Sequence, residues 1–232
     1  LSYTAQIADL PPDGQSVRIW IPLARTMRNQ TVLARHVRVP ARYEIHREPV
    51  YGNDILYLDV QPPFSQPIEI AVDYEVVVQG GSRWRPPHGR DAGASHQERA
   101  RHLRDEPLLV VDDTVARLAQ QATAGRAGDL EKARAIYDYV VGHMRYDKQL
   151  PGWGRGDTLR ACRLGAGNCT DFHSLFISMA RSVRIPARFM IGAPIPPSPG
   201  GAISGYHCWA EFYAEDDGWV PVDASEAWKH PE

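Results

Sequence analysis

The hydrophobic pattern of residues 1–80 is that of β-strands, and no stretch of it keeps a helical period over a useful length. Apolar runs predict strands at 17–21, 31–33, 37–39, 55–60 and 68–78. Turn signals separate these runs, at Pro11-Pro12, Pro22, Pro40, Gly52-Asn53 and Pro62-Pro63. Turns at this density predict an antiparallel, β-sandwich-like scaffold or adaptor domain over residues 1–80 that ends at Gly80-Gly81.

Helical periodicity begins after residue 107. Asp112 or Asp113 is placed to cap a helix that runs to about Thr123, and Asp129 to cap a longer helix. The longer helix has one apolar stripe, formed by Leu130, Ala133, Ile136, Tyr137, Val140, Val141 and Met144. A third helix, with one buried face, is expected to begin at Cys169, and a buried strand to follow the break at Pro186.

Residues 82–107 are rich in Arg, Pro and His, and we expect a solvated loop there that could cross near an active site. Its histidines, His88, His96 and His102, do not have the spacing of a helical or strand zinc pair, so no metal site is expected. Nothing in the sequence indicates a nucleotide or organic cofactor.

The last part of the chain carries a hairpin signal, Asp217-Gly218 between aromatic and β-branched runs. If Tyr213 pairs with Trp219, His207 and Asp223 lie on the same face as diagonal neighbours, with backbones about 7–8 Å apart. A slip of one residue would separate them, so this expectation depends on the register.

Cys169 follows a glycine-rich turn and opens a helix, where unpaired N–H groups and the helix dipole favour a thiolate. The alternative is that it is only a small buried hydrophobic residue. With His207 as the base and Asp223 orienting that base, it would form a Cys-His-Asp triad. His173, four residues after Cys169, is the alternative base, although it has no predicted carboxylate partner.

Four motifs, in order, resemble the transglutaminase-like superfamily of papain-related cysteine enzymes: Gly167-Asn-Cys169-x-Asp171, Arg184-Ile-Pro-Ala-Arg188, Gly205-Tyr-His207-x-Trp209-Ala-Glu211 and Gly218-Trp-Val-Pro-Val-Asp223. With a preceding helix they cover about residues 108–226. The resemblance implies an α+β fold in which residues 81–232 form a catalytic core of helices packed on an antiparallel sheet.

The same resemblance assigns Cys169 as the acyl-accepting nucleophile, His207 as its acid and base, and Asp223 as the group that fixes the histidine. It also suggests that an upstream aromatic residue, Trp153 or Tyr146, lines the acyl site or donates to the oxyanion. Animal transglutaminases have glutamine and tryptophan on either side of the cysteine, where this chain has Asn168 and Thr170. The chain is therefore more similar to the broad bacterial branch.

The expected activity is acyl transfer from a peptide or protein carboxamide through a thioester. Water in place of an amine would make the protein an amide hydrolase or cysteine peptidase, and an idle triad would leave a binding module. The net charge of −2 and pI near 6.5 give no reason to expect nucleic acid or an anionic membrane as partner. No apolar run approaches the roughly 20 residues that span a bilayer.

The chain begins at Leu1 without methionine, which suggests that an upstream segment such as a signal peptide is left out, and a periplasmic or secreted location is slightly favoured. Its three cysteines allow either one Cys162–Cys208 bridge or three free thiols. We expect free thiols, with Cys208 in a layer packed behind the site and neither it nor Cys162 catalytic.

Overall fold

The structure is a computed structural model that describes residues 1–10, 14–27, 29–64, 67–78, 94–195, 200–203 and 205–231. The chain forms two compact units, Leu1–Trp84 and Arg85–Glu232. The boundary predicted at Gly80-Gly81 lies outside the described residues, as do Trp84 and His88.

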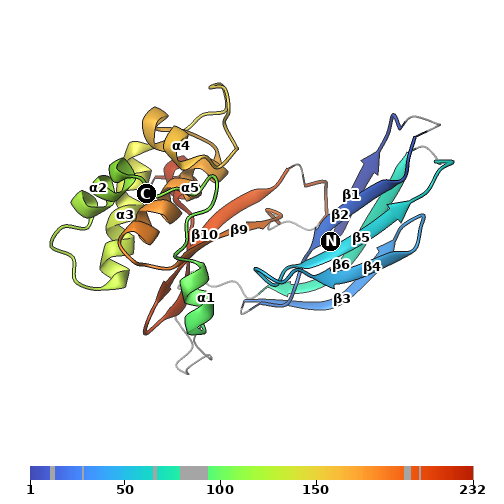
Figure 1. The fold of residues 1–232 in the computed structure, drawn as a ribbon, viewed down its shortest axis with the longest axis horizontal. Helices are drawn as coiled ribbons and strands as arrows, with labels where there is room; N and C mark the ends of the chain where they lie inside the picture. The colour runs from blue at the N-terminus through green and yellow to red at the C-terminus, as the bar shows by residue number, and fades with distance from the viewer. Residues whose placement is uncertain are drawn as a thin grey trace. The chain divides into compact units, whose positions relative to one another are not determined.

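The first unit consists of two three-stranded antiparallel sheets (Figure 1). The strand orders are β1 (Ser2–Ile7)–β6 (Ile68–Val78)–β3 (Gln30–Arg38) and β2 (Val17–Leu23)–β5 (Asp54–Val60)–β4 (Tyr43–Arg47). Alternate side chains of both sheets meet in one apolar core: Ile21, Leu23, Leu56, Leu58, Val60, Ile68, Ile70 and Val72. The expected antiparallel β architecture is therefore confirmed.

Two details of this unit differ from the prediction. A single strand, β3, replaces the two predicted at 31–33 and 37–39, because an irregularity between Val32 and Ala34 keeps the strand paired with β6. Strands β1 and β4 were not predicted, and β4 has no buried residue, so it lacks the apolar signal by which strands are found.

The second unit combines helices with a three-stranded antiparallel sheet. Its elements are α1 (His96–Arg101), α2 (Asp113–Ala122), α3 (Asp129–His143), β7 (Arg145–Tyr146), α4 (Thr158–Leu164), β8 (Ala166–Gly167), α5 (Cys169–Ser182), β9 (Ala187–Gly192), β10 (His207–Ala214), β11 (Gly218–Val222) and α6 (Ala224–Lys229). The sheet order is β11-β10-β9, and β7 and β8 form a short parallel pair.

Helices α2, α3 and α5 were predicted, with one correction to a cap. Asp112 caps α2 as expected, but α3 begins after Gly128, and Asp129 is its first residue and makes no cap hydrogen bond. Helix α1 lies in the segment predicted to be a loop. It is short, capped by Ser95 and has no buried residue, so it carries no apolar stripe.

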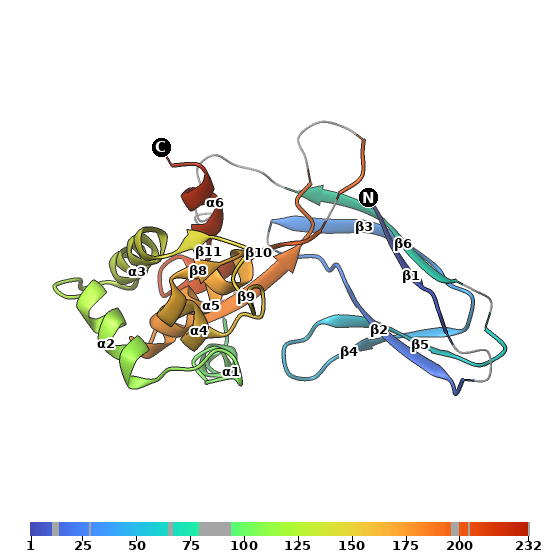
Figure 2. The same cartoon turned by 90° about the horizontal axis from the view of Figure 1, so that it is seen from above.

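Helix α5 lies at the centre of this unit (Figures 1 and 2). It packs against α2, α3, α4 and α6 and against β9 and β10. The prediction of one buried face was wrong, because Ser174, Ser178 and Arg181 are buried as well. Their polar groups are paired: the Ser178 hydroxyl lies 2.8 Å from that of Thr158, and the Arg181 guanidinium donates to the Ala187 carbonyl.

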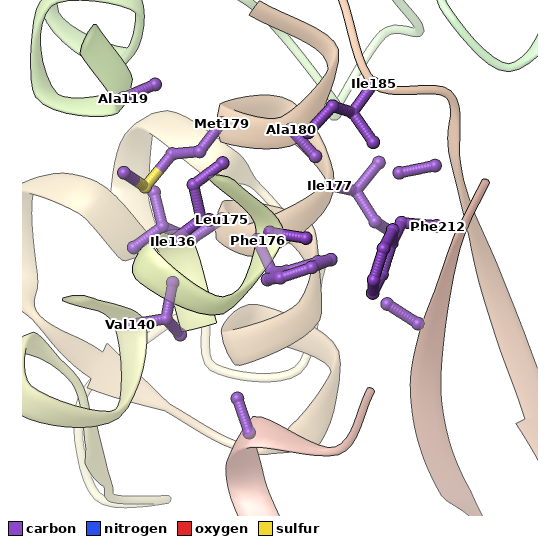
Figure 3. Close-up of a cluster of buried hydrophobic side chains, with 14 of the residues drawn as sticks. Ala119, Ile136, Val140, Leu175, Phe176, Ile177, Met179, Ala180, Ile185 and Phe212 are labelled. Atoms are coloured by element: carbon purple, nitrogen blue, oxygen red, sulfur yellow. The ribbon is translucent and has the colours of Figure 1, made fainter. Parts of the chain in front are cut away.

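The apolar side chains of α5 hold it in place on several sides at once. Figure 3 shows Leu175 and Met179 beside Ile136 of α3, while Phe176 and Ile177 lie toward Phe212 of β10. The Phe176 and Phe212 ring centroids are 6.2 Å apart. Replacing one such side chain by alanine typically costs about 2–5 kcal/mol. This packing fixes the position of the first turn of α5, where Cys169 lies.

Candidate active site

Cys169 is the first residue of α5, and the residues on either side of it stabilise the start of this helix. Asn168 is the N-cap, and its side-chain oxygen accepts from the Thr170 N–H at 3.0 Å. The Asp171 carboxylate accepts in turn from the Asn168 N–H at 3.0 Å, which completes a capping box. A Cβ atom at Gly167 would lie 2.2 Å from the Asp171 carboxylate, so this turn requires glycine.

Asp171 also ties the upstream loop to the same turn. Its two oxygens accept from the Gly154 N–H at 2.7 Å and the Gly156 N–H at 3.3 Å. The buried Arg160 guanidinium donates to the Pro151 and Ala166 carbonyls, at 2.9 and 3.2 Å. The loop that carries Trp153 is therefore held against the turn that carries Cys169.

The hairpin of β10 and β11 has the predicted register, with Tyr213 opposite Trp219. His207 Nε2 lies 2.5 Å from Asp223 Oδ2, so the structure brings these two side chains together as the register required. Asp223 also caps α6, accepting through Oδ1 from the Glu226 N–H at 3.0 Å. This contact leaves Nδ1 of His207 available to face a thiol.

The pKa of Asp223 is lowered. Burial by itself would raise it, but the hydrogen bonds from the Glu226 N–H and from His207, together with the electrostatic effect of His207, outweigh burial. The carboxylate is thus ionised and able to orient the imidazole.

The pKa of the Cys169 thiol is lowered to about 6, mainly by a hydrogen bond from the Cys208 side chain. Burial opposes this shift, while the Cys208 N–H, the charge of His207 and the Thr170 N–H add to it. Among the described contacts, Cys169 and His207 share no hydrogen bond, so His207 acts on the thiol through its charge. The thiol itself is nearly enclosed, since Cys169 is 3% exposed.

The expectation that Cys208 lies in a layer behind the site was wrong. Cys208 is on the opposite strand face from His207, as predicted, but that face packs on α5, whose first turn carries Cys169. Its sulfur lies 3.5 Å from the Thr170 hydroxyl. The hydrogen bond to Cys169 and burial raise the pKa of Cys208, so Cys208 stays protonated and serves as donor.

His173 does not face the thiol. Its Nδ1–H donates to the Cys169 carbonyl at 2.7 Å, and its Nε2 accepts from the Ala224 N–H at 3.1 Å. Burial lowers its pKa to about 4, which keeps the ring neutral. Because both ring nitrogens are hydrogen-bonded to backbone groups, His173 connects α5 to α6. These contacts argue against the alternative assignment of His173 as the base. It does lie 3.6 Å from an Asp223 oxygen, a carboxylate neighbour that the sequence did not reveal.

The two aromatic candidates, Tyr146 and Trp153, lie in β7 and in the loop between β7 and α4. Tyr146 pairs with Gly167 across β7 and β8, and its ring is 6.2 Å from that of Phe172. Trp153 is 39% exposed. Neither donates a hydrogen bond to Cys169 in the described part of the chain.

A third aromatic residue, Tyr206, was missed by the sequence analysis. Its hydroxyl lies 3.4 Å from Asn168 Nδ2 and 3.4 Å from Thr170 Oγ1, so it spans the start of α5 on either side of Cys169. The only available signal was its place directly before His207.

All three cysteines are free, as expected, and Cys162 is half-buried on α4. Residues 94–195, 200–203 and 205–231, like the described part of the first unit, contain no group of three His, Cys, Asp or Glu side chains that could hold a metal ion. No helix among the described residues is long and apolar enough to cross a membrane.

A buried helix that opens with a cysteine, packed on an antiparallel sheet that carries a histidine, defines the papain-related, transglutaminase-like class of fold. Residues 116–224 match the family model of the transglutaminase-like superfamily. The resemblance found in the four motifs is thereby confirmed.

The chain is similar to several known proteins. An uncharacterised protein of Haemophilus influenzae is 29% identical over 178 residues, covering 68% of this chain and 47% of the relative, so this chain spans about half of it. The crystal structure of a candidate cysteine protease from Cytophaga hutchinsonii shares the fold, with a TM-score of 0.71, 18% identity and coverage of 97% of this chain and 74% of that one.

A further fold match is the periplasmic domain of TgpA from Pseudomonas aeruginosa. Its TM-score is 0.51 and its identity 15%, with coverage of 98% of this chain and 76% of that one.

Proposed function

We propose that this protein is a cysteine-dependent acyltransferase that acts on carboxamides of peptides or proteins through a Cys169-His207-Asp223 triad. The observation that carries the proposal is the 2.5 Å His207–Asp223 contact beside a thiol whose pKa is lowered to about 6 at the start of a helix. A free cysteine, with a pKa of about 8.5, is mostly protonated at neutral pH. A pKa of about 6 leaves most of the Cys169 thiol ionised at that pH.

In the proposed reaction the Cys169 thiolate attacks the carboxamide carbon. The Cys169 N–H and one further donor hold the oxyanion, each donor contributing about 3–4 kcal/mol in measured cases. Tyr146 and Trp153 are candidates for that second donor, and Tyr206 joins them because its hydroxyl lies at the same turn. His207 protonates the departing amine, and an amine or water then resolves the thioester.

Hydrolysis by the same triad is the second candidate function. The structural likeness to a candidate cysteine protease favours it, although at 18% identity that likeness concerns the fold. A catalytically idle triad in a binding module is the third. An exported, periplasmic location remains part of the proposal, suggested by the fold shared with the periplasmic domain of TgpA.

The test compares wild type with Cys169→Ala and His207→Ala on casein, with and without a fluorescent primary amine. Incorporation of the amine indicates acyl transfer, and release of new peptide termini or ammonia without incorporation indicates hydrolysis. Either activity should disappear in both variants, because each removes an essential member of the triad.

Cys162→Ala is the matched control, since it removes a thiol from α4, away from the proposed triad, and should retain the activity. Turnover that persists in folded Cys169→Ala would contradict the mechanism. Slow alkylation of Cys169 by iodoacetamide at mildly acidic pH would favour the idle module, because an unactivated thiol reacts slowly there.

A further inference from the structure

Two of the protein's three lysines lie at the ring of Tyr146. The chain has 23 arginines but only Lys132, Lys148 and Lys229 as lysines. Lys229 Nζ is 4.2 Å from the centre of the Tyr146 ring and Lys148 Nζ is 5.8 Å from it. Lys148 Nζ also lies 5.4 Å from the ring of Trp153. Both ammonium groups therefore lie near the same aromatic ring.

The tyrosine between these two lysines belongs to a strand that pairs with the turn before the candidate nucleophile. Tyr146 pairs with Gly167, two residues before Cys169, and the Asp147 N–H donates to the Gly167 carbonyl at 2.9 Å. Lys229 lies in the last turn of α6, which packs on both α5 and β7. Strand β7 thus brings Tyr146, whose ring both ammonium groups approach, to the turn that opens α5, and α6 carries Lys229 on the same side.

The negative charge of the Cys169 thiolate contributes to the pKa of Lys229. Burial would lower the pKa of Lys229, but the hydrogen bond to Glu226 and the negative charges of the Glu226 carboxylate and the Cys169 thiolate help to raise it. Lys229 therefore remains positively charged beside the thiolate.

The negative charges nearby do not cancel this positive charge completely. Glu226 accepts from Lys229 at 2.6 Å, but within the described ranges Lys148 has no ion-pair partner. The carboxylate of Asp147 is occupied by the Gln149 N–H at 2.7 Å and by Arg145 at 3.4 Å.

Two further charged groups, Arg160 and Asp171, bind the backbone of the loop. The Arg160 guanidinium is bound only to carbonyl groups among the described contacts, and it offsets the buried carboxylate of Asp171. The exposed face of the cluster consequently keeps an excess of positive charge.

From this arrangement we propose that Lys148 and Lys229 form a subsite for a carboxylate of the acyl substrate, with Tyr146 and Trp153 as its aromatic wall. This inference rests on the proposed function and names its substrate class: a peptide with an acidic side chain or a free carboxylate close to the scissile amide. An ammonium group suits this role because it is a compact charge with three donors, able to meet a carboxylate from several directions.

The aromatic rings attract each ammonium group through the ring face. The lysine chains therefore lose less freedom when a carboxylate arrives. A neutral substrate of the same shape would meet the same rings without the charge interaction.

The test uses a pair of small probes that differ in charge, iodoacetate and iodoacetamide. Each alkylates the Cys169 thiolate by forming the C–S bond as the C–I bond breaks and iodide leaves. The observable is the ratio of the two rate constants at the Cys169 peptide, measured by mass spectrometry, with 2-mercaptoethanol as the reference thiol. Because both probes attack the same thiolate, the ratio cancels any change in the pKa of Cys169.

We expect iodoacetate to be favoured at Cys169 relative to the reference thiol. In the Lys148→Gln/Lys229→Gln double variant the ratio should fall by about threefold or more at low ionic strength, as expected for loss of unit charges within several ångströms. The difference should shrink toward about 1 M salt. Lys132→Gln, which removes the remaining lysine, on α3, is the matched control and should leave the ratio unchanged.

An unchanged ratio in the double variant, or an equal fall in Lys132→Gln, would overturn the inference while leaving the proposed function in place. If neither probe labels Cys169 as an activated thiol, the proposed function fails and this inference fails with it. Circular dichroism and the urea midpoint of each variant confirm that the fold is retained, since the Lys229–Glu226 pair is a surface contact.

Discussion

Removal of the Cys208 sulfur should raise the pKa of the candidate nucleophile. The pKa of Cys169 lies at about 6 rather than 9.0, and the Cys208 side chain is the largest cause of that shift. A hydrogen bond to a charged group is worth about 1.5–3 kcal/mol, and one pKa unit corresponds to about 1.36 kcal/mol. Cys208→Ala should therefore move the pKa of Cys169 up by about one to two units, to between about 7 and 8.

The assay is the rate of iodoacetamide alkylation at the Cys169 peptide as a function of pH. The midpoint of this curve reports the pKa, because only the thiolate reacts. At pH 6 the thiolate fraction should fall from about one half in wild type to about a tenth or less in Cys208→Ala. Above about pH 9 both proteins should be fully ionised, so the difference between them should disappear.

Two variants make the interpretation specific. Cys208→Ser keeps a donor at the same position and should retain most of the lowered pKa. Cys162→Ala removes a thiol from α4 and should leave the midpoint near 6. A midpoint near 6 in Cys208→Ala would refute the assignment of Cys208 as the donor, and a wild-type midpoint near 9 would refute activation of the thiol itself.

Three further predictions concern the groups around the thiol. His173 is held neutral in the folded state, where its pKa is about 4 rather than 6.5, so the unfolded state binds the extra proton and wild type loses stability as pH falls from 6.5 to about 4. Urea titrations should show that the free energy of unfolding falls less steeply with pH in His173→Gln, and equal pH slopes would contradict the buried neutral ring. Asp171→Ala leaves three backbone N–H groups without their acceptor and should cost about 3 kcal/mol or more in denaturant unfolding, with a loss under about 1 kcal/mol arguing against its role. Asp223→Asn should reduce kcat/KM on a working substrate less than Cys169→Ala does, because the orienting group typically contributes less than the nucleophile; equal losses would indicate a different role for Asp223.

Short-range signals made the main elements of the candidate site predictable. The glycine-rich turn and Asn168 cap the helix that begins at Cys169, and both act within a few residues. The Asp217-Gly218 turn fixes the hairpin register, and the register alone puts His207 and Asp223 on one face. These features depend on backbone geometry that neighbouring residues determine.

The surroundings of the thiol depend on elements far apart in the sequence. His173 was open to assignment as a base until Ala224, 51 residues later, was found to occupy its second nitrogen. Cys208 was placed behind the site because strand alternation states which face a residue is on, but not what packs against that face.

What the sequence by itself determined is where the helix starts, how the hairpin pairs and which side chains share a face. The tertiary structure decided that α5 is buried on every side, that its first turn meets the Cys208 face of β10, and that β7 and α6 bring Lys148 and Lys229 to one tyrosine ring. The physical reason is that a periodic pattern specifies the faces of an element, whereas the pKa of a thiol depends on the groups that other elements place around it.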